Sequence, residues 1–246
     1  MSNTSLNIVV ADNERDFYIR AAWHVIGQIL QKPSSVIGLS TGRTTKHVHL
    51  LIGGIFSNYP FPVGDTTFFG LDEVMNVPRE YAGACYTMLK TELMDTFGVR
   101  EENFLMLPTQ AVDFMAACRD FQSELERRGG IDLLLLGLGE NGHLGFNQPG
   151  SPLAGETWAT DMDEALEQRI RRETGTPSDK KLGGVTLGLK NIMHARKLVL
   201  LANGKHKATI VKRMLQGVVT PEVPASVLQL HPCCEFLLDP AAASEL

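Results

Sequence analysis

A single histidine stands in the middle of a glycine-rich loop, in the stretch DLLLLGLGENGHLGFNQPG that covers residues 132–150. Three side chains around His143 could orient or charge its ring: Glu140, Asn141 and Gln148. A histidine exchanges protons near neutral pH, and glycines let a ligand approach the backbone closely. The loop therefore favours acid–base chemistry, and the alternative is a histidine with a purely structural role.

Two neighbouring carboxylates, Asp72 and Glu73, end a second apolar stretch, TTFFGLDE at residues 66–73. Partial burial at the end of a strand raises the pKa of a carboxyl group toward a value that suits proton transfer. The alternative is that the two acids only solvate the strand end.

A third stretch, GLSTGRTT, has the composition of an anion-binding turn. A strand that leads through this turn into a helix presents free backbone N–H groups and the positive end of the helix dipole. The GxxxxGK[ST] and GxGxxG spacings are both absent, so this is neither a Walker loop nor a dinucleotide fingerprint. A plain helix-capping turn is the alternative. The candidate phosphate ligands here are Ser40, Thr41, Gly42, Arg43 and Thr44.

Further cations could complete an anion site. Lys205 and Lys207 begin a predicted helix, where a positive charge opposes the dipole, so anion binding would explain them better than helix stability does. The charged segment 162–172 is predicted to be a helix or a lid, and one of its arginines could add a phosphate contact. Arg169, Arg171 and Arg172 are the candidates for this contact, and for the two lysines a solvated side chain is the alternative.

The elements that must position these residues alternate along the chain. Apolar runs predict strands, and stripes of apolar residues at helical spacing predict the helices between them. Such alternation indicates right-handed crossovers, hence an α/β fold with a mainly parallel, Rossmann-like sheet flanked by helices, as one domain over residues 1–246. The predicted strands are 6–11, 35–40, 66–73, 131–139, 196–204 and 234–239, and the predicted helices are 13–31, 45–57, 84–97, 110–128 and 205–216.

Ligand sites of parallel sheets lie at the carboxyl ends of the strands. The histidine loop, the two carboxylates, the anion-binding turn and the lysine pair all follow predicted strands, so they are expected to meet at one edge of the sheet. Their convergence is more informative than any one of them alone.

Composition excludes several other functions. A net charge of −5 without a basic face argues against nucleic-acid binding. We expect no membrane partner, because no segment approaches the roughly 20 apolar residues that a span requires. The four cysteines show no metal-binding spacing and suggest reduced thiols in the cytoplasm. His47 and His49 are two residues apart on a predicted helix and face different sides, so no metal site is expected there.

Together these motifs make the chain resemble the glucosamine-6-phosphate deaminase/isomerase family, which includes galactosamine-6-phosphate isomerases and is related to 6-phosphogluconolactonases. The resemblance covers nearly the whole chain, and GHLGFN is similar to the deaminase branch rather than to the GHxASLFP of the lactonases. It is carried by STGRTT, LDE, GLGENGHLGFNQPGS, ANGKHKA and VPASVLQLHP.

The resemblance implies a phosphosugar substrate, no metal or organic cofactor, and a possible homo-oligomer. The 6-phosphate would bind residues 41–45 with Lys207 and Arg172. His143 would move the proton that opens the sugar ring, and Asp72 would transfer a proton between C1 and C2.

One residue departs from the family pattern. Relatives usually carry Glu where this chain has Gln148, whereas Asn141 is within the family's range. An amide can orient the ring of His143 but supplies no charge, so this histidine is expected to be less basic than in relatives. In serine proteases, changing the orienting Asp to Asn lowers the rate about 10⁴-fold, and a similar loss here would cripple ring opening. We therefore expect an altered substrate preference or weak deaminase activity.

Two other functions remain open from the sequence. A lactonase-type hydrolase would need His143 as a base for water but has no use for Asp72. A sugar-phosphate-binding protein without catalysis would fit Gln148, but not the presence of both Asp72 and His143.

Overall fold

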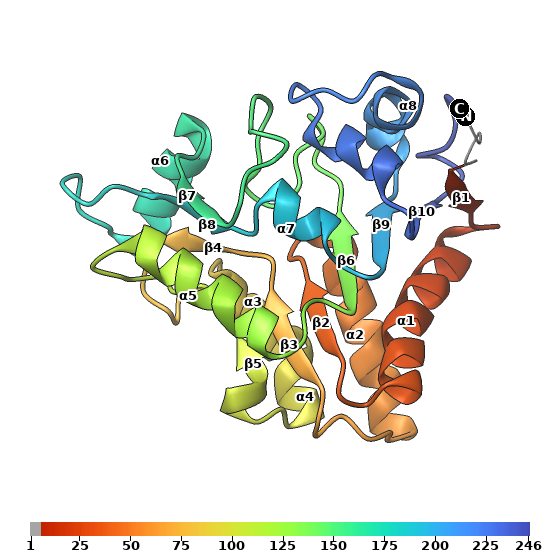
Figure 1. Cartoon of the computed structure of the whole chain (residues 1–246), viewed down its shortest axis with the longest axis horizontal. Helices are drawn as coiled ribbons and strands as arrows, with labels where there is room; N and C mark the ends of the chain where they lie inside the picture. The colour runs from red at the N-terminus through yellow and green to blue at the C-terminus, as the bar shows by residue number, and fades with distance from the viewer. Residues whose placement is uncertain (1–5) are drawn as a thin grey trace.

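Parallel strands form the central sheet of the structure, a computed structural model that describes residues 6–246 (Figure 1). The seven strands lie in the order β1-β10-β9-β6-β2-β3-β5, and every neighbouring pair is parallel. The α/β class and the mainly parallel sheet predicted from the sequence are confirmed. The strands are β1 (Asn7–Val10), β2 (Val36–Leu39), β3 (Thr67–Gly70), β5 (Phe104–Leu105), β6 (Leu133–Gly137), β9 (Leu198–Ala202) and β10 (Cys234–Leu238).

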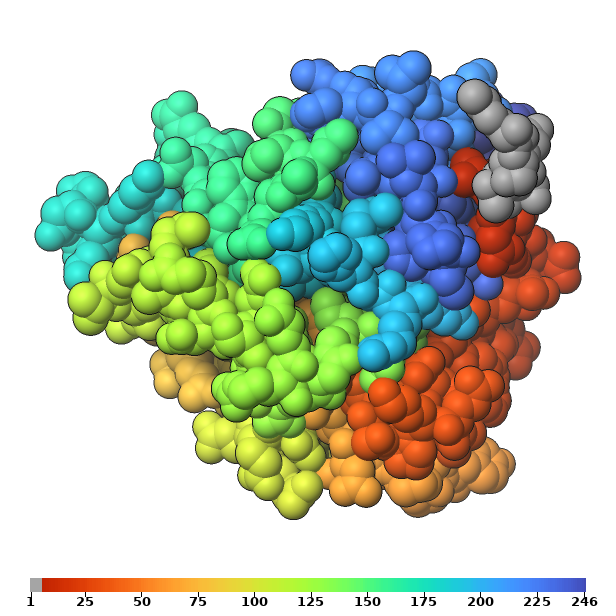
Figure 2. Space-filling model, viewed as in Figure 1, coloured from red at the N-terminus to blue at the C-terminus, as the bar shows by residue number. Residues whose placement is uncertain are grey.

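Helices cover both faces of this sheet. Figure 2 shows α7 between α5 and the C-terminal segment. The buried side chains of α5 and α7 belong to the core on one face of the sheet, and those of α1 and α2 to the core on the other. None of the helices within residues 6–246 has the length and apolar character needed to cross a bilayer. They are α1 (Glu14–Gln31), α2 (Arg43–Asn58), α3 (Cys85–Leu89), the π-helix η1 (Lys90–Met94), α4 (Asp95–Phe97), η2 (Glu101–Asn103), α5 (Phe114–Arg127), α6 (Glu164–Thr174), α7 (Leu189–Met193), η3 (Lys205–Lys207), α8 (Ala208–Gln216) and η4 (Pro224–Leu230).

Strand β6 shows why an uninterrupted apolar run is needed at the centre of the sheet. Its side chains point alternately to the two faces. Leu133 and Leu135 pack with α1 and α2 in one core, and Leu134 and Leu136 pack with α5, α7 and α8 in the other. All four are fully buried, as expected for a strand with helices on both sides.

A second, smaller sheet corrects the predicted strand 66–73. The strand breaks at Leu71: β3 ends at Gly70, and Asp72 begins β4 (Asp72–Met75). Strand β4 pairs antiparallel with β8 (Gly183–Thr186), which pairs antiparallel with β7 (Trp158–Thr160). Leu71 joins the two sheets, because its N–H donates to Leu39 O at 3.1 Å and its carbonyl accepts from Leu187 N at 2.9 Å.

The point at which the strand order of the main sheet reverses lies between β2 and β6. From β2 the chain adds β3 and β5 toward one edge, and from β6 it adds β9 and β10 toward the other. The loops after these two central strands therefore diverge to opposite faces and leave a crevice between them.

Asp132, at the opposite edge of the sheet from this crevice, clamps the starts of β2 and β6. Its buried carboxylate accepts from Lys32 Nζ at 2.8 Å, Arg196 Nη1 at 3.1 Å and Val36 N at 2.9 Å. We expect Asp132→Ala to lower the free energy of unfolding by about 2 kcal/mol, because a buried N–H and two cations lose their acceptor.

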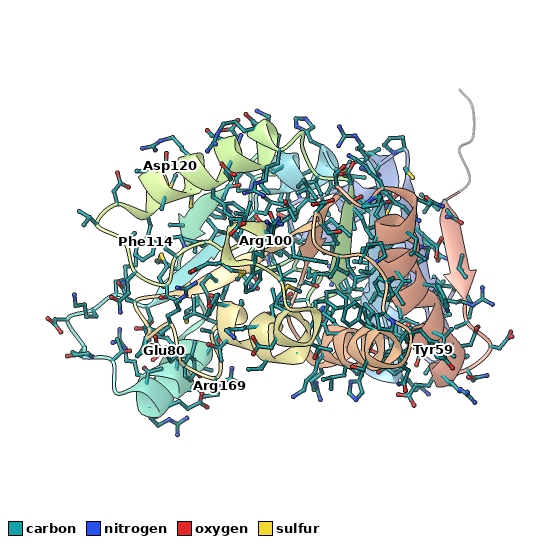
Figure 3. All side chains as sticks on the ribbon, turned by 90° about the horizontal axis from the view of Figure 1, so that it is seen from below. Tyr59, Glu80, Arg100, Phe114, Asp120 and Arg169 are labelled. Atoms are coloured by element: carbon teal, nitrogen blue, oxygen red, sulfur yellow. The ribbon has the colours of Figure 1, made fainter. Side chains whose placement is uncertain are left out.

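Urea denaturation measures this loss. Asp120→Ala is the matched control, since Asp120 lies on the outer surface of α5 (Figure 3) and is exposed. Equal stability of the two variants would contradict the role given to Asp132.

Candidate active site

A cavity of about 640 Å³ opens at the carboxyl edge of the sheet, over the point where the strand order reverses. The loops after β2, β6 and β9 contribute to it, as does Asp72 at the start of β4. The predicted convergence of these segments is what the structure shows. Of the residues named from the sequence, the cavity is lined by Ser40, Thr41, Gly42, Arg43, Thr44, His47, Asp72, Glu140, Asn141, His143 and Lys207.

The ring of His143 is held by Asn141. The Oδ1 atom of Asn141 accepts from the backbone N–H of His143 at 3.1 Å and lies 2.7 Å from its Nδ1. Since the backbone N–H can only donate, this atom must be the amide oxygen, and Nδ1 must carry the ring proton. Within residues 6–246 no group hydrogen-bonds Nε2, so this nitrogen has a free lone pair and can accept a proton.

Gln148 contacts Asn141 rather than the histidine. Its Oε1 accepts from Asn141 Nδ2 at 3.0 Å, so the two amides and the imidazole form a chain. The orienting role that we expected of Gln148 thus belongs to Asn141, and Gln148 prevents the Asn141 amide from turning over. The large loss inferred from serine proteases reflects a wrong tautomer, and this arrangement maintains the correct one.

The environment of His143 favours its neutral form. Burial lowers its pKa, and the nearby Lys207 ammonium lowers it further, while the carboxylates of Asp163 and Glu140 act in the opposite direction. A glycine is required beside the ring, since a Cβ at Gly139 would lie 2.4 Å from its Cε1. The imidazole is therefore a fixed, uncharged group near neutral pH.

Asp72 faces the same loop from the smaller sheet. A Cβ at Gly145, where φ is +57°, would lie 3.2 Å from Asp72 Oδ2, so the carboxylate is packed directly against the histidine loop. Burial raises the pKa of Asp72 to about 6, opposed by a hydrogen bond from the Cys85 thiol. A carboxylate of this pKa can accept and return a proton near neutral pH.

Glu73, the other carboxylate of the pair, has a structural role. It is fully buried, and its oxygens accept the backbone N–H groups of Val74, Cys85 and Tyr86 at 2.7, 2.8 and 2.8 Å. Burial raises its pKa to about 7. Glu73 thus ties the start of α3 to β4, and it does not line the cavity around Asp72 and His143.

The anion-binding turn begins at an extended segment and enters α2 at Arg43. Gly42 has a φ of +143°, which favours glycine, and the first turn of α2 contains no acidic residue. Free N–H groups at this end of α2 therefore face the cavity without a competing carboxylate. Thr44 Oγ1 donates to Asn203 Oδ1 at 2.6 Å, which ties the turn to the loop after β9.

Ser40 lines the cavity, but its hydroxyl is occupied by the backbone. Its Oγ donates to Leu135 O at 3.1 Å and accepts from Gly137 N at 3.0 Å. Ser40 is buried, so this side chain joins the β2 and β6 loops and has little capacity left for a ligand.

Two cations converge on the turn. Lys207 Nζ donates to Leu138 O at 2.7 Å, and burial lowers its pKa, with Arg43 adding to the effect. An anion placed between Lys207 and Arg43 would relieve this repulsion. Lys205 does not line the cavity.

Arg172 is not brought to this cavity. It lies on α6, which forms one end of the molecule in Figure 1, and its Nε donates to Gln168 O at 3.4 Å. The label of Arg169 in Figure 3 shows the same peripheral position for this helix. Helix α6 connects β7 to β8 of the smaller sheet, and none of its residues lines the cavity, so the phosphate contact of Arg172 stays a prediction.

Several residues of the site were not identified from the sequence. Cys85 reaches Asp72 from α3, and Tyr18 and Glu14 reach the cavity from α1. Asn203, in the quoted ANGKHK, could have been found from its place at a strand end. The others come from helix interiors or starts with no local signal, so only the packing of the elements reveals them.

The remaining histidines that were considered for metal binding have other partners. His49 is buried with its Nδ1 2.8 Å from Glu92 Oε2, and His47 Nδ1 lies 2.8 Å from Arg43 O. Among residues 6–246 there is no group of three or more His, Cys, Asp or Glu side chains that could hold a metal ion.

Comparison with known proteins gives one consistent result. Residues 19–234 match the family described as glucosamine-6-phosphate isomerases/6-phosphogluconolactonase. A glucosamine-6-phosphate deaminase of Halothermothrix orenii is 33% identical over 98% of this chain and 100% of its own length. One of Clostridium botulinum is 31% identical over 98% of this chain and 99% of its own length.

Solved structures of similar proteins agree in fold. A structure described as a monomeric glucosamine-6-phosphate deaminase superposes with a TM-score of 0.89 at 25% identity, covering 98% of this chain and 100% of that one. The 6-phosphogluconolactonase from Trypanosoma cruzi superposes with a TM-score of 0.78 at 20% identity, covering 98% and 97% of the two chains. At this lower identity the likeness shows the shared fold alone.

Proposed function

Because the chain belongs to the family of glucosamine-6-phosphate isomerases and 6-phosphogluconolactonases, we propose that it converts a 6-phosphorylated 2-amino sugar into a ketose 6-phosphate and ammonia. Glucosamine-6-phosphate and galactosamine-6-phosphate are the candidate substrates. The observation that carries the proposal is the placement of a partly desolvated carboxylate, Asp72, and a neutral imidazole, His143, in one cavity with an anion-binding turn.

The phosphate is the first part of the substrate to be positioned. It would accept from the backbone N–H groups and hydroxyls of residues 41–45 and pair with Lys207 and Arg43. This anchor places the other end of the sugar toward the histidine loop and Asp72.

Ring opening would use the free Nε2 of His143. It removes the proton of the C1 hydroxyl and delivers it to the ring oxygen as the bond between C1 and this oxygen breaks, which leaves an open-chain aldehyde. The Nδ1–H bond to Asn141 stabilises the imidazolium that forms transiently, although without a full negative charge.

Asp72 would then move a proton between the two carbons of the aldehyde end. The carbonyl at C1 acidifies the C2–H bond, so the carboxylate can remove this proton and return it to C1. As the oxygen at C1 gains a proton and the 2-amino group loses one, the product is a 1-hydroxy-2-imine. Water adds to the imine, which releases ammonia and leaves the ketose. No step in this sequence requires a metal or an organic cofactor.

A lactonase activity is the second candidate, since the family includes 6-phosphogluconolactonases. It would employ His143 to activate water but would leave a desolvated carboxylate at Asp72 without a task. An assay of ammonia release from a panel of 6-phosphorylated amino sugars, run beside hydrolysis of 6-phosphogluconolactone, separates the two. Binding of these phosphosugars without turnover of any would instead indicate a non-catalytic binding protein.

The pH dependence of kcat/KM is expected to show an acidic limb near pH 6. Asp72 must be ionised to act as a base, and its raised pKa of about 6 means that activity falls as the pH decreases through this value. The lowered pKa of His143 keeps its neutral, active form available over the same range. A pH profile that stays flat down to pH 4.5 would contradict the role of Asp72.

Lys207→Met is expected to raise KM about 10- to 100-fold for the phosphorylated sugar, the range for losing a hydrogen bond to a charged group. Arg172→Met is the matched control on a cation that the structure keeps away from the cavity, and its KM should change less than twofold. Steady-state kinetics on one substrate measures both. A large effect of Arg172→Met together with a small effect of Lys207→Met would reverse our assignment.

A further inference from the structure

We propose that Cys85 is a positioning residue for Asp72, holding the carboxylate by a hydrogen bond from its thiol and linking it to the anion-binding turn at Thr41. The kinetic consequences rest on the function proposed above, whereas the effect on Asp72 itself does not. Neither the motifs in the sequence nor the roles assigned to the site residues include this cysteine.

The geometry forms a short chain of polar groups. Cys85 Sγ lies 3.4 Å from Asp72 Oδ1 and 3.3 Å from Thr41 Oγ1. An ionised carboxylate only accepts, so the thiol donates to Asp72 and is left to accept from the Thr41 hydroxyl. Within residues 6–246 no other group hydrogen-bonds the Asp72 side chain, which makes this thiol its one directional contact in the described part of the chain.

The thiol is suited to this role because it stays protonated. Cys85 is only 4% exposed, and burial together with the charges of Asp72 and Glu73 raises its pKa well above the usual value. The S–H group is thus a donor at any pH where the enzyme would act. The same environment makes Cys85 a poor nucleophile, which argues against a covalent role.

The position of Cys85 is determined by Glu73. The buried Glu73 carboxylate accepts the N–H groups of Cys85 and Tyr86 where α3 begins, so the start of the helix is tied to the residue next to Asp72. The backbone N–H of Cys85 is thus bound by Glu73, while its thiol points at the carboxylate of Asp72, the residue that precedes Glu73. This gives the thiol a fixed place although the helix is short.

Other charges reach Asp72 less directly. Glu73 adjoins it in the chain, and the other titratable or charged groups that line its cavity make no hydrogen bond to it: Glu14, Tyr18, Arg43, His47, Glu140, His143, His206 and Lys207. Removing the thiol leaves these groups unchanged, so a change in the titration of Asp72 would report on the thiol.

The test compares Cys85→Ala and Cys85→Ser with the unmodified chain. Loss of the donor favours the protonated carboxyl, so in Cys85→Ala the pKa of Asp72 should rise by about half a pH unit. The acidic limb of kcat/KM should move up by the same amount, a loss of about threefold below pH 5.5 and none above pH 8. Cys85→Ser restores a donor and should return the limb toward that of the unmodified chain.

Cys118→Ala is the matched control. This cysteine is also buried, but it lies on α5 in the core, away from the cavity. Its removal should leave the pH profile unchanged, and thermal melting of all three variants shows whether each remains folded.

Carbon NMR of the Asp72 carboxyl separates the inference from the proposed function, because it requires no substrate. An upward shift of this titration in Cys85→Ala, reduced in Cys85→Ser, supports the positioning role even if no amino sugar is turned over. Identical titrations in the unmodified chain and in folded Cys85→Ala would overturn it even if the enzyme deaminates its substrate.

Discussion

Asp72→Asn is expected to lower kcat about 10³-fold on an aminosugar phosphate while KM changes little, because an asparagine cannot take the proton from C2. The amide is almost the same size as the carboxyl group and can still accept from the thiol of Cys85. The loss should therefore be in proton transfer rather than in folding or substrate binding. Stopped-time assays of ammonia and ketose formation measure it.

The same variant distinguishes the candidate reactions. Exchange of the C2 hydrogen with solvent should stop along with ammonia release, while binding of the phosphosugar, followed by calorimetry, persists. If Asp72→Asn retains full turnover, or if it hydrolyses 6-phosphogluconolactone as well as the unmodified chain does, the isomerase assignment is wrong.

The second large effect is expected at Asn141. Replacement by leucine removes the only acceptor found for Nδ1 of His143 within residues 6–246, so the ring can turn and adopt the other tautomer. We expect kcat to fall about 100-fold, since proton transfer by a correctly held group contributes on this order. Pre-steady-state measurement of ring opening should show the loss, with the C1–C2 proton transfer unaffected.

Asn141→Asp, compared with the leucine variant, tests the effect of adding a charge while an acceptor for Nδ1 is kept. A carboxylate 2.7 Å from Nδ1 should raise the pKa of His143 by about one unit and increase its strength as a base. Gln148 can accommodate it by turning its amide to donate. The comparison uses turnover of both glucosamine-6-phosphate and galactosamine-6-phosphate.

Gln148→Glu tests whether the missing negative charge at this position limits activity. Because Gln148 touches Asn141 and not the histidine, a charge here acts from one side chain further away, and its gain should be smaller than that of Asn141→Asp. No gain from either variant on either substrate would reject an explanation based on charge.

Much of the fold was predictable because the strands of the main sheet are buried on both sides. The apolar run of β6 and the apolar stripe of α1 are local sequence patterns, and each one predicts its element without knowledge of distant contacts. The two-residue strand β5 is too short for any pattern. The small sheet was missed because its strands form through contacts distant in sequence: Gly183–Thr186 pairs with Asp72–Met75 on one side and with Trp158–Thr160 on the other.

The residues of the candidate site also differ in how well they could be predicted from the sequence. Residues that follow strands, such as Asp72, His143 and Lys207, were found because a parallel sheet brings strand ends together. The connection of Gln148 to Asn141 could not be found, since it depends on how a glycine-rich loop folds back on itself. Arg172 was named through the family resemblance, and it lies on a helix that does not line the cavity.

Leu71 gives the fold a further property. Its two backbone groups bond to different sheets, so the proposed phosphate-binding turn at residues 41–45 follows a strand of the main sheet, whereas Asp72 begins a strand of the smaller sheet. Substitutions in the smaller sheet can therefore alter the surroundings of Asp72 without changing the strand that leads into the turn. This separation is compatible with a family that includes both isomerases and 6-phosphogluconolactonases.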